Sequence, residues 1–246
     1  MRVYTAALRP SPNPSRVSFV IFAQGRSGSS LLVDLMRSHP DVHCDEEILD
    51  RRVLLPSAWV RAHRRRHPDS HYGFKVKPYQ LTVDQRLDPR AWLTRMHDRG
   101  WRLIRLTRRT VLRHALSNMV AEHVGRYVFR GGSAPEASPI TVDVDMLLGA
   151  MAVRTEQAGL ERGALAGLPY VQVTYEDDLL DARAHQATLD RISAGIGLPS
   201  ANARTDVRRI TGDDLRETIA NYDEVASAVG GTEWAPLLDD PASPPG

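Results

Sequence analysis

The sequence predicts an α/β fold, a single domain in which a parallel sheet is flanked by helices. Two observations lead to this prediction. Short apolar runs rich in β-branched and aromatic residues alternate along the chain with longer stretches whose apolar residues recur at helical spacing. No internal repeat and no evident interdomain linker interrupts this alternation. It is typical of parallel sheets, because each crossover between parallel strands usually contains a helix.

The elements can be placed in order along the chain. Pro40 is expected to stop the first helix, and the glycine- and proline-containing stretch 129–139 is expected to be a loop. Strands are expected at 17–23, 72–76, 102–107 and 170–174. Helices are expected from Leu31 to Pro40, at 110–124, 144–165 and 184–194, and from Asp213 or Asp214 to Val229. The folded domain is predicted to span 16–238, between a flexible lead-in at 1–15 and a flexible tail at 239–246.

Composition narrows the class of protein. The 246 residues are 42% hydrophobic, which is enough for a sizeable core, and the formal net charge is only +2. A protein that coats nucleic acid usually carries a larger and more segregated positive excess, so we expect no nucleic-acid partner. The single cysteine, Cys44, excludes an internal disulfide and a cysteine-rich zinc site, and no histidine motif indicates another metal. Without an apolar run of membrane-spanning length or a signal peptide, the protein is expected to be cytoplasmic, and its oligomeric state is left open.

The most informative local pattern is the turn after the first predicted strand. Gln24–Ser30 (QGRSGSS) joins a buried strand to an amphipathic helix, the position at which α/β sheets bind ligands. Two glycines allow successive backbone N–H groups to point at one anion, and the helix N-terminus adds its positive dipole. An ordinary serine-capped turn would have the same pattern. The candidate anion-binding residues are Gly25, Arg26, Ser27, Gly28, Ser29 and Ser30.

The same turn departs from two common nucleotide-binding motifs. It has no lysine and therefore no Walker A sequence, and its glycines are three residues apart, unlike those of GxGxxG. These departures weaken the ATPase and dinucleotide-binding interpretations.

Four segments taken in order resemble a known family. RSGSS, followed by a leucine-rich helix and HPDV, resembles the 5′-phosphosulfate-binding loop of sulfotransferases that use 3′-phosphoadenosine 5′-phosphosulfate (PAPS). RLTRRTVLRHALS (105–117) resembles the family's 3′-phosphate segment, and TYEDDLL (174–180) its YEDL box. RRITGDDLRETIANYDEV (208–225) resembles the C-terminal segment of carbohydrate-type members, a group that includes the bacterial trehalose sulfotransferase. The resemblance implies a P-loop-like sulfotransferase fold and further cofactor-binding residues at Arg109, Ser117, Tyr175, Arg208 and Arg209.

The resemblance also implies the chemistry. A sulfuryl group would pass from PAPS to an acceptor hydroxyl, or alternatively an amine, by in-line displacement that leaves adenosine 3′,5′-bisphosphate and needs no metal. Arg26 would bind the 5′-phosphate and stabilise charge on the bridging oxygen. Glu47 is expected to be the general base, with Glu46 as the alternative one residue away; a solvated acidic turn would look the same. Lys75, in the GFKVKPYQ segment, would contact the sulfuryl oxygens or the acceptor.

The acceptor and two other function classes are left open. A carbohydrate or another small molecule with a hydroxyl group is compatible with the sequence. A P-loop kinase-like phosphotransferase would need a Walker lysine, which is absent, and magnesium-binding carboxylates. A non-catalytic nucleotide-binding protein would keep the loop but lack the base.

Overall fold

The computed structural model describes residues 13–131, 138–208 and 214–238. The described residues form two compact units, one comprising the chain up to Thr107 with Leu160–Thr205, the other Arg108–Gly159 with the chain from Asp206 onward. The expected tail, most of the expected lead-in, the centre of the 129–139 loop and Arg209 lie outside the described residues. The boundaries predicted for one sulfotransferase domain over 16–238 stay a prediction.

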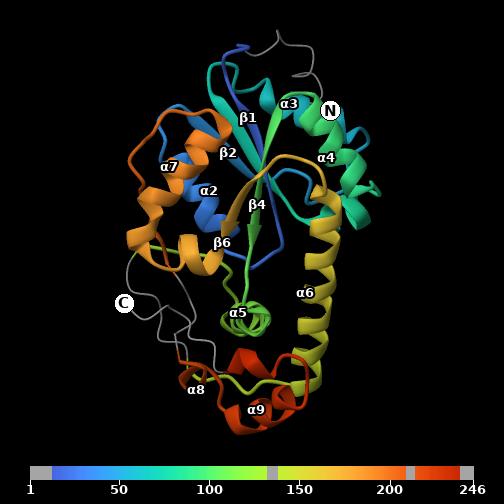
Figure 1. Cartoon of the computed structure of the whole chain (residues 1–246), viewed down its shortest axis with the longest axis vertical. Helices are drawn as coiled ribbons and strands as arrows, with labels where there is room; N and C mark the ends of the chain where they lie inside the picture. The colour runs from blue at the N-terminus through green and yellow to red at the C-terminus, as the bar shows by residue number, and fades with distance from the viewer. Residues whose placement is uncertain (1–12, 132–137, 209–213, 239–246) are drawn as a thin grey trace. The chain divides into compact units, whose positions relative to one another are not determined.

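The first unit contains a parallel sheet of five strands in the order β2-β3-β1-β4-β6 (Figure 1). The predicted α/β fold class is therefore confirmed. In chain order the elements of this unit are β1 (Ser18–Ala23), α2 (Ser29–Arg37), β2 (Val42–Glu47), α3 (Pro56–Arg64), β3 (His71–Val76), η2 (Gln80–Asp84), α4 (Pro89–Asp98), β4 (Trp101–Thr107), β6 (Val171–Thr174), η3 (Tyr175–Leu179), η4 (Ala182–Ala184) and α7 (His185–Ile196).

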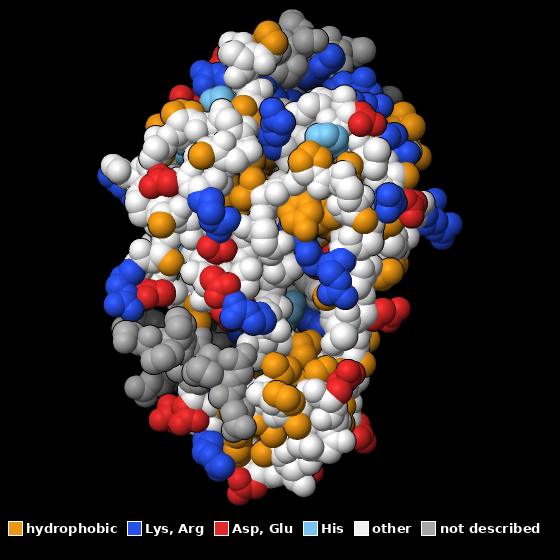
Figure 2. All heavy atoms as spheres, in the orientation of Figure 1, with side chains coloured by type: hydrophobic (Ala, Val, Ile, Leu, Met, Phe, Trp, Pro, Cys, Tyr) orange, Lys and Arg blue, Asp and Glu red, His pale blue; other side chains and the backbone are white. Residues whose placement is uncertain are grey.

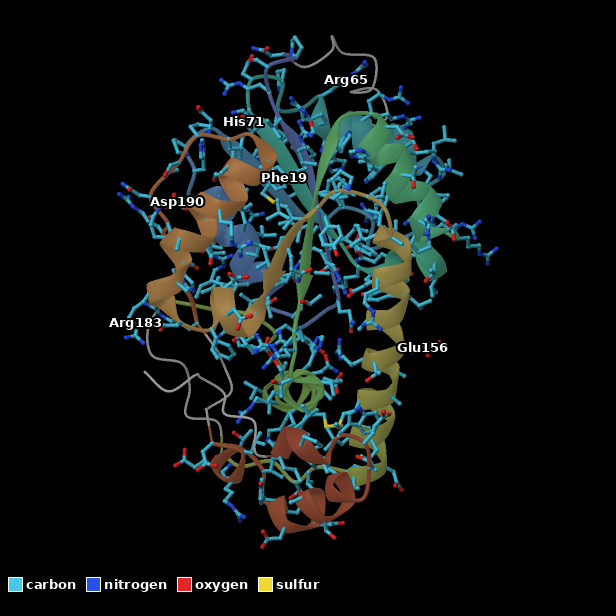
Figure 3. All side chains as sticks on the ribbon, viewed as in Figure 1. Phe19, Arg65, His71, Glu156, Arg183 and Asp190 are labelled. Carbon is cyan, nitrogen blue, oxygen red and sulfur yellow. The ribbon has the colours of Figure 1, made fainter. Side chains whose placement is uncertain are left out.

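The sheet is covered on both faces, which explains why its inner strands are almost continuously apolar. Helices α2 and α7 pack on one face, and α3 and α4 cover the other (Figure 1). Phe19 of β1 lies within this layered core (Figure 3). Its neighbour on β3 is Gly73, where an added Cβ would lie 2.1 Å from the Phe19 ring, so the pairing of these strands requires glycine there.

The chain order of the strands creates a topological switch point at the carboxyl ends of β1 and β4. After β1 the chain turns towards β2 on one side, whereas after the adjacent β4 it proceeds to β6 on the other. The connections leaving the carboxyl ends of β1 and β4 thus diverge, and ligands of open α/β sheets bind at such a point. The Gln24–Ser30 turn leaves β1 there.

The second unit is mainly helical and has its own apolar core. Its elements are α5 (Val111–Val124), β5 (Phe129–Arg130), most of α6 (Val144–Leu165), β7 (Val207–Arg208), α8 (Leu215–Thr218), α9 (Tyr222–Gly230) and η5 (Ala235–Leu238). Strands β5 and β7 form an antiparallel pair. From Leu160 onward, α6 belongs to the first unit.

One predicted helix is wrong. The single helix expected up to Val229 is interrupted between α8 and α9, where Ile219 is extended and Ala220 donates its N–H to the Ile140 carbonyl. The Asn221 side chain holds both backbone groups of Val142, at 2.9 Å each. These bonds to a neighbouring segment replace the i to i−4 bonds that a continuous helix would make.

Among the described residues, no helix is both long and apolar enough to cross a bilayer. On the face drawn in Figure 2, basic and acidic side chains are interspersed.

Candidate active site

The loop after β1 has the geometry of an anion-binding turn. Gly28 caps α2 in the left-handed conformation (φ 92°), and Arg26 is also left-handed (φ 66°), which is uncommon for a residue with a side chain. The buried Ser27 hydroxyl donates to the Gln24 carbonyl at 2.7 Å and fixes the turn. The first turn of α2 holds no acidic residue. No carboxylate in the first turn of the helix therefore competes with an anion for its N-terminal backbone donors.

A tyrosine from the YEDDL segment holds this loop from the side. A Cβ added to Gly28 would lie 2.5 Å from Cδ2 of Tyr175, so the aromatic ring packs directly on the glycine. Tyr175 is buried and begins η3, immediately after β6. Gly28 is thus required twice, for its positive φ and for the approach of the ring.

Two glutamates meet a lysine because β2 contains a bulge. The parallel register of β2 and β3 shifts between Asp45, which pairs with Phe74, and Glu47, which pairs with Lys75. Both Glu46 and Glu47 therefore reach the same ammonium group: Lys75 Nζ lies 2.5 Å from Glu46 Oε2 and 3.2 Å from Glu47 Oε1. A bulge of this kind re-aims side chains at the end of a strand.

The second lysine and a glutamine complete the environment of Glu47. Lys77 Nζ lies 2.8 Å from Glu47 Oε2, and the Gln80 amide donates to the same oxygen at 2.6 Å. Burial raises the pKa of Glu47, but hydrogen bonds and charges from Lys77 and Lys75 outweigh it and hold that pKa below its usual value. Conversely, Glu47 raises the pKa of Lys77 against the opposing effect of burial. At neutral pH the carboxylate and the Lys77 ammonium are therefore both charged.

Both lysines also reach the loop. Lys75 Nζ lies 3.0 Å from the Ser30 hydroxyl on the first turn of α2. The Lys77 side chain lies over Gly25, with Cε 3.4 Å from the position of an added Cβ. Glu47 is consequently connected to both ends of the turn through two ammonium groups. This arrangement can hold an anion at the loop beside an ionised carboxylate.

Asp45 anchors the strand that carries these glutamates. Its carboxylate accepts from the Tyr72 hydroxyl at 2.7 Å and lies 3.3 Å from His63 Nδ1 and 3.1 Å from His43 Nε2. Burial raises the pKa of Asp45, but these hydrogen bonds bring it well below its usual range. The end of β2 is thus tied to α3 and β3 by an ionised group.

Comparison with known proteins gives a relative over nearly the whole chain. Nodulation protein H of Rhizobium tropici, a sulfotransferase, is 25% identical over 257 residues, which cover 96% of this chain and 98% of that protein. The resemblance to the sulfotransferase family is confirmed. Among solved structures, the sulfotransferase domain of the Synechococcus PCC 7002 olefin synthase has a TM-score of 0.45 and 14% identity, covering 92% of this chain and 89% of that one. No family model matches.

The residues expected from the sulfotransferase motifs fall into two groups. The loop, Glu46, Glu47, Lys75 and Tyr175 belong to the first unit and are brought together there. Arg109, Ser117 and Arg208 belong to the second unit, where Arg109 is exposed, Ser117 is buried in α5 and Arg208 lies on β7. Arg209 lies outside the described residues. Their roles stay predictions.

The sequence assigns no role to three residues in or beside this candidate site. Lys77 contacts Glu47 and the loop, whereas the sequence predicts a role only for Lys75 in this segment. Gln80, a fully buried amide bound to Glu47, was missed. A buried glutamate on α6, Glu161, was missed as well. The spacing of two lysines in a chain that contains no others was the available signal for Lys77.

Proposed function

We propose that this protein transfers the sulfuryl group of PAPS to a hydroxyl group of a carbohydrate or other small-molecule acceptor. The similarity to nodulation protein H supports sulfotransferase activity. The observation that carries the proposal is the ionised Glu47 carboxylate held between two lysines that also contact the anion-binding turn. An acceptor base, cationic groups for sulfuryl oxygens and a phosphate-binding loop are what such a transfer needs at one place.

The donor would be bound through its 5′-phosphosulfate end at the loop. Backbone N–H groups from Gly25 to Ser30, the Ser29 and Ser30 hydroxyls and the Arg26 guanidinium provide donors suited to phosphate oxygens. By resemblance, the 3′-phosphate would be bound by Arg109 and Ser117, with further contacts from Arg208 and Arg209. The residues present fit a polyanionic nucleotide, since the two glutamates beside the loop are neutralised by Lys75 and Lys77.

The reaction requires positioning and charge stabilisation rather than a covalent enzyme intermediate. The acceptor oxygen attacks sulfur in line, a new O–S bond forms, and the bond from sulfur to the 5′-phosphate oxygen breaks with its electron pair remaining on the phosphate. The acceptor proton passes to Glu47, and the products are the sulfate ester and adenosine 3′,5′-bisphosphate. Lys75 and Lys77 would balance negative charge on the sulfuryl oxygens, and Arg26 the charge on the departing phosphate.

Glu47 is a better candidate for the base than Glu46. The Glu47 side chain is 20% exposed, against 40% for Glu46, and its carboxylate contacts both lysines and Gln80. Glu46 instead contacts Lys75 and, at 3.9 Å, Arg37 at the end of α2. An enclosed carboxylate linked to the loop is better placed to receive a proton at the reacting centre.

A turnover assay tests this proposal. Purified protein is supplied with PAPS and a panel of sugars and small hydroxyl compounds, and adenosine 3′,5′-bisphosphate formation is measured in the wild type and in Glu47→Gln and Glu46→Gln. We expect acceptor-dependent turnover that Glu47→Gln lowers by about a hundredfold or more, because a positioned base contributes about 10²–10⁴-fold. Glu46→Gln, the matched neighbour, should retain most of it. A loss below about tenfold in Glu47→Gln would remove the base assignment.

A further inference from the structure

A cluster of three buried polar side chains adjoins the Gln24–Ser30 turn, near the carboxyl ends of β1 and β4. Glu161 on α6 is 1% exposed, Gln24 at the end of β1 is 6% exposed, and Arg105 on β4 is 9% exposed. Gln24 donates hydrogen bonds to the Glu161 carboxylate from its side-chain amide and its backbone N–H. Gln24 also immediately precedes Gly25, and the Gln24 carbonyl accepts a hydrogen bond from the Ser27 hydroxyl. Glu161 therefore contacts the residue from which the anion-binding turn begins.

The carboxylate is only partly satisfied. Among the described residues, Glu161 Oε1 has no hydrogen-bond partner, although the atom is fully enclosed. A buried carboxylate oxygen without a donor is costly, and the cost disappears when the group binds a proton. Burial accordingly raises the pKa of Glu161 to about 7, against the opposing effects of Arg105, the Gln24 hydrogen bonds and Arg162.

Three other charged groups lie near Glu161 or the helix turn that carries it. Arg105 approaches from β4, and Arg162 is the exposed next residue of α6. From α4, Arg90 donates to the Gly163 carbonyl at 3.4 Å, two residues further along the helix. All three are arginines and stay protonated across the neutral range, so Glu161 is the group in this cluster that changes charge there.

We propose that Glu161 is a positioning residue that takes up a proton when an anionic nucleotide occupies the Gln24–Ser30 turn. The inference rests on the proposed function. A bound phosphosulfate or phosphate adds negative charge at the turn that begins with Gln24, and this charge disfavours the ionised form of Glu161. Protonation relieves that repulsion while the Gln24 amide keeps its bond to the carboxyl group. The Gln24–Ser30 turn with a nucleotide bound is thus more stable when Glu161 is protonated and neutral.

The coupling has a direct calorimetric signature. Binding of adenosine 3′,5′-bisphosphate is measured at pH 7.5 in buffers of different ionisation enthalpy, so that the slope of observed enthalpy gives the protons taken up. If binding raises the pKa of Glu161 by about one unit, the wild type takes up about half a proton more than Glu161→Gln. The nucleotide itself takes up the same number of protons with either protein, so subtracting the uptake measured for Glu161→Gln leaves the contribution of Glu161.

Glu156→Gln is the matched control. Glu156 lies on the same helix and points outward (Figure 3), and it is exposed. Glu156→Gln should give the wild-type proton uptake. Equal uptake in the wild type and Glu161→Gln would overturn the inference while leaving the proposed function intact. No binding of the bisphosphate to the wild type would overturn both.

A second measurement needs no variant. In protein labelled with carbon-13 at glutamate carboxyl groups, one buried carboxyl resonance should titrate near pH 7 in the free protein. Adding the bisphosphate should move this titration to higher pH. An unchanged midpoint would contradict the inference even if Glu161→Gln fails to fold.

Discussion

Replacement of Glu161 by glutamine should make the stability of the protein less sensitive to alkaline pH. The pKa of Glu161 is raised from 4.5 to about 7 by burial, so the folded state holds this proton more tightly than the unfolded chain. The stability that this proton contributes is fully present below about pH 4.5 and is lost as the pH rises through about 7. This raised pKa corresponds to about 3 kcal/mol over the whole pH range, of which about 2 kcal/mol lies between pH 5.5 and 8.5.

Urea unfolding at several pH values between 5.5 and 8.5 measures this effect. The free energy of unfolding of the wild type, relative to Glu161→Gln, should fall by about 2 kcal/mol across this range, because glutamine cannot ionise. The difference between the wild type and Glu156→Gln should stay constant, since Glu156 is exposed. A difference between wild type and Glu161→Gln that does not change with pH would refute the assignment of a buried, proton-binding carboxyl group.

Three further predictions concern the loop, the environment of Glu47 and the buried cysteine. Gly28→Ala should destabilise the protein by about 2–4 kcal/mol and abolish bisphosphate binding, because alanine is strained at positive φ and its methyl group would overlap a tyrosine ring. Gly149→Ala is the control, because an added Cβ at this position in α6 meets no atom within 4 Å, and it should stabilise the protein by about 0.5–1 kcal/mol in the same unfolding assay. If both glycine variants changed the free energy of unfolding equally, the contact between Gly28 and the tyrosine ring would not explain the loss. Lys77→Ala should raise the pKa of Glu47, so the acid limb of the rate–pH profile should move to higher pH, and an unmoved limb would show that Lys77 does not act on the base. Cys44 is buried, which raises the pKa of its thiol, so a maleimide should react with it only after denaturation; rapid labelling of folded protein would contradict that burial.

The loop and most strands were predictable because their signals are local. A buried strand, two glycines and an amphipathic helix occupy consecutive positions, and the predicted strand at 17–23 matches β1 within one residue. Strand β2 was not predicted, because it lies at the sheet edge and mixes Val42 and Cys44 with charged residues. The basic run at 61–67 has a composition typical of a solvated surface, yet Arg64 is buried and donates to the Ser18 hydroxyl at 3.0 Å.

The remaining site features depend on contacts between distant segments. The bulge that aims both glutamates at Lys75 is a property of the β2–β3 register, and no residue pattern in β2 marks it. Gln80 meets Glu47 from 33 residues away. Glu161 reads as one of many polar residues on a long helix, and only the packing of α6 against the end of β1 and β4 shows that it is enclosed.

The most direct test of the central claim is a calorimetric titration of the purified protein with adenosine 3′,5′-bisphosphate in the absence of metal, compared with ATP plus magnesium. A sulfotransferase that binds PAPS at the Gln24–Ser30 turn should bind the bisphosphate with micromolar affinity and without metal. Binding of ATP with magnesium, together with no response to the bisphosphate, would contradict the account and favour a phosphotransferase.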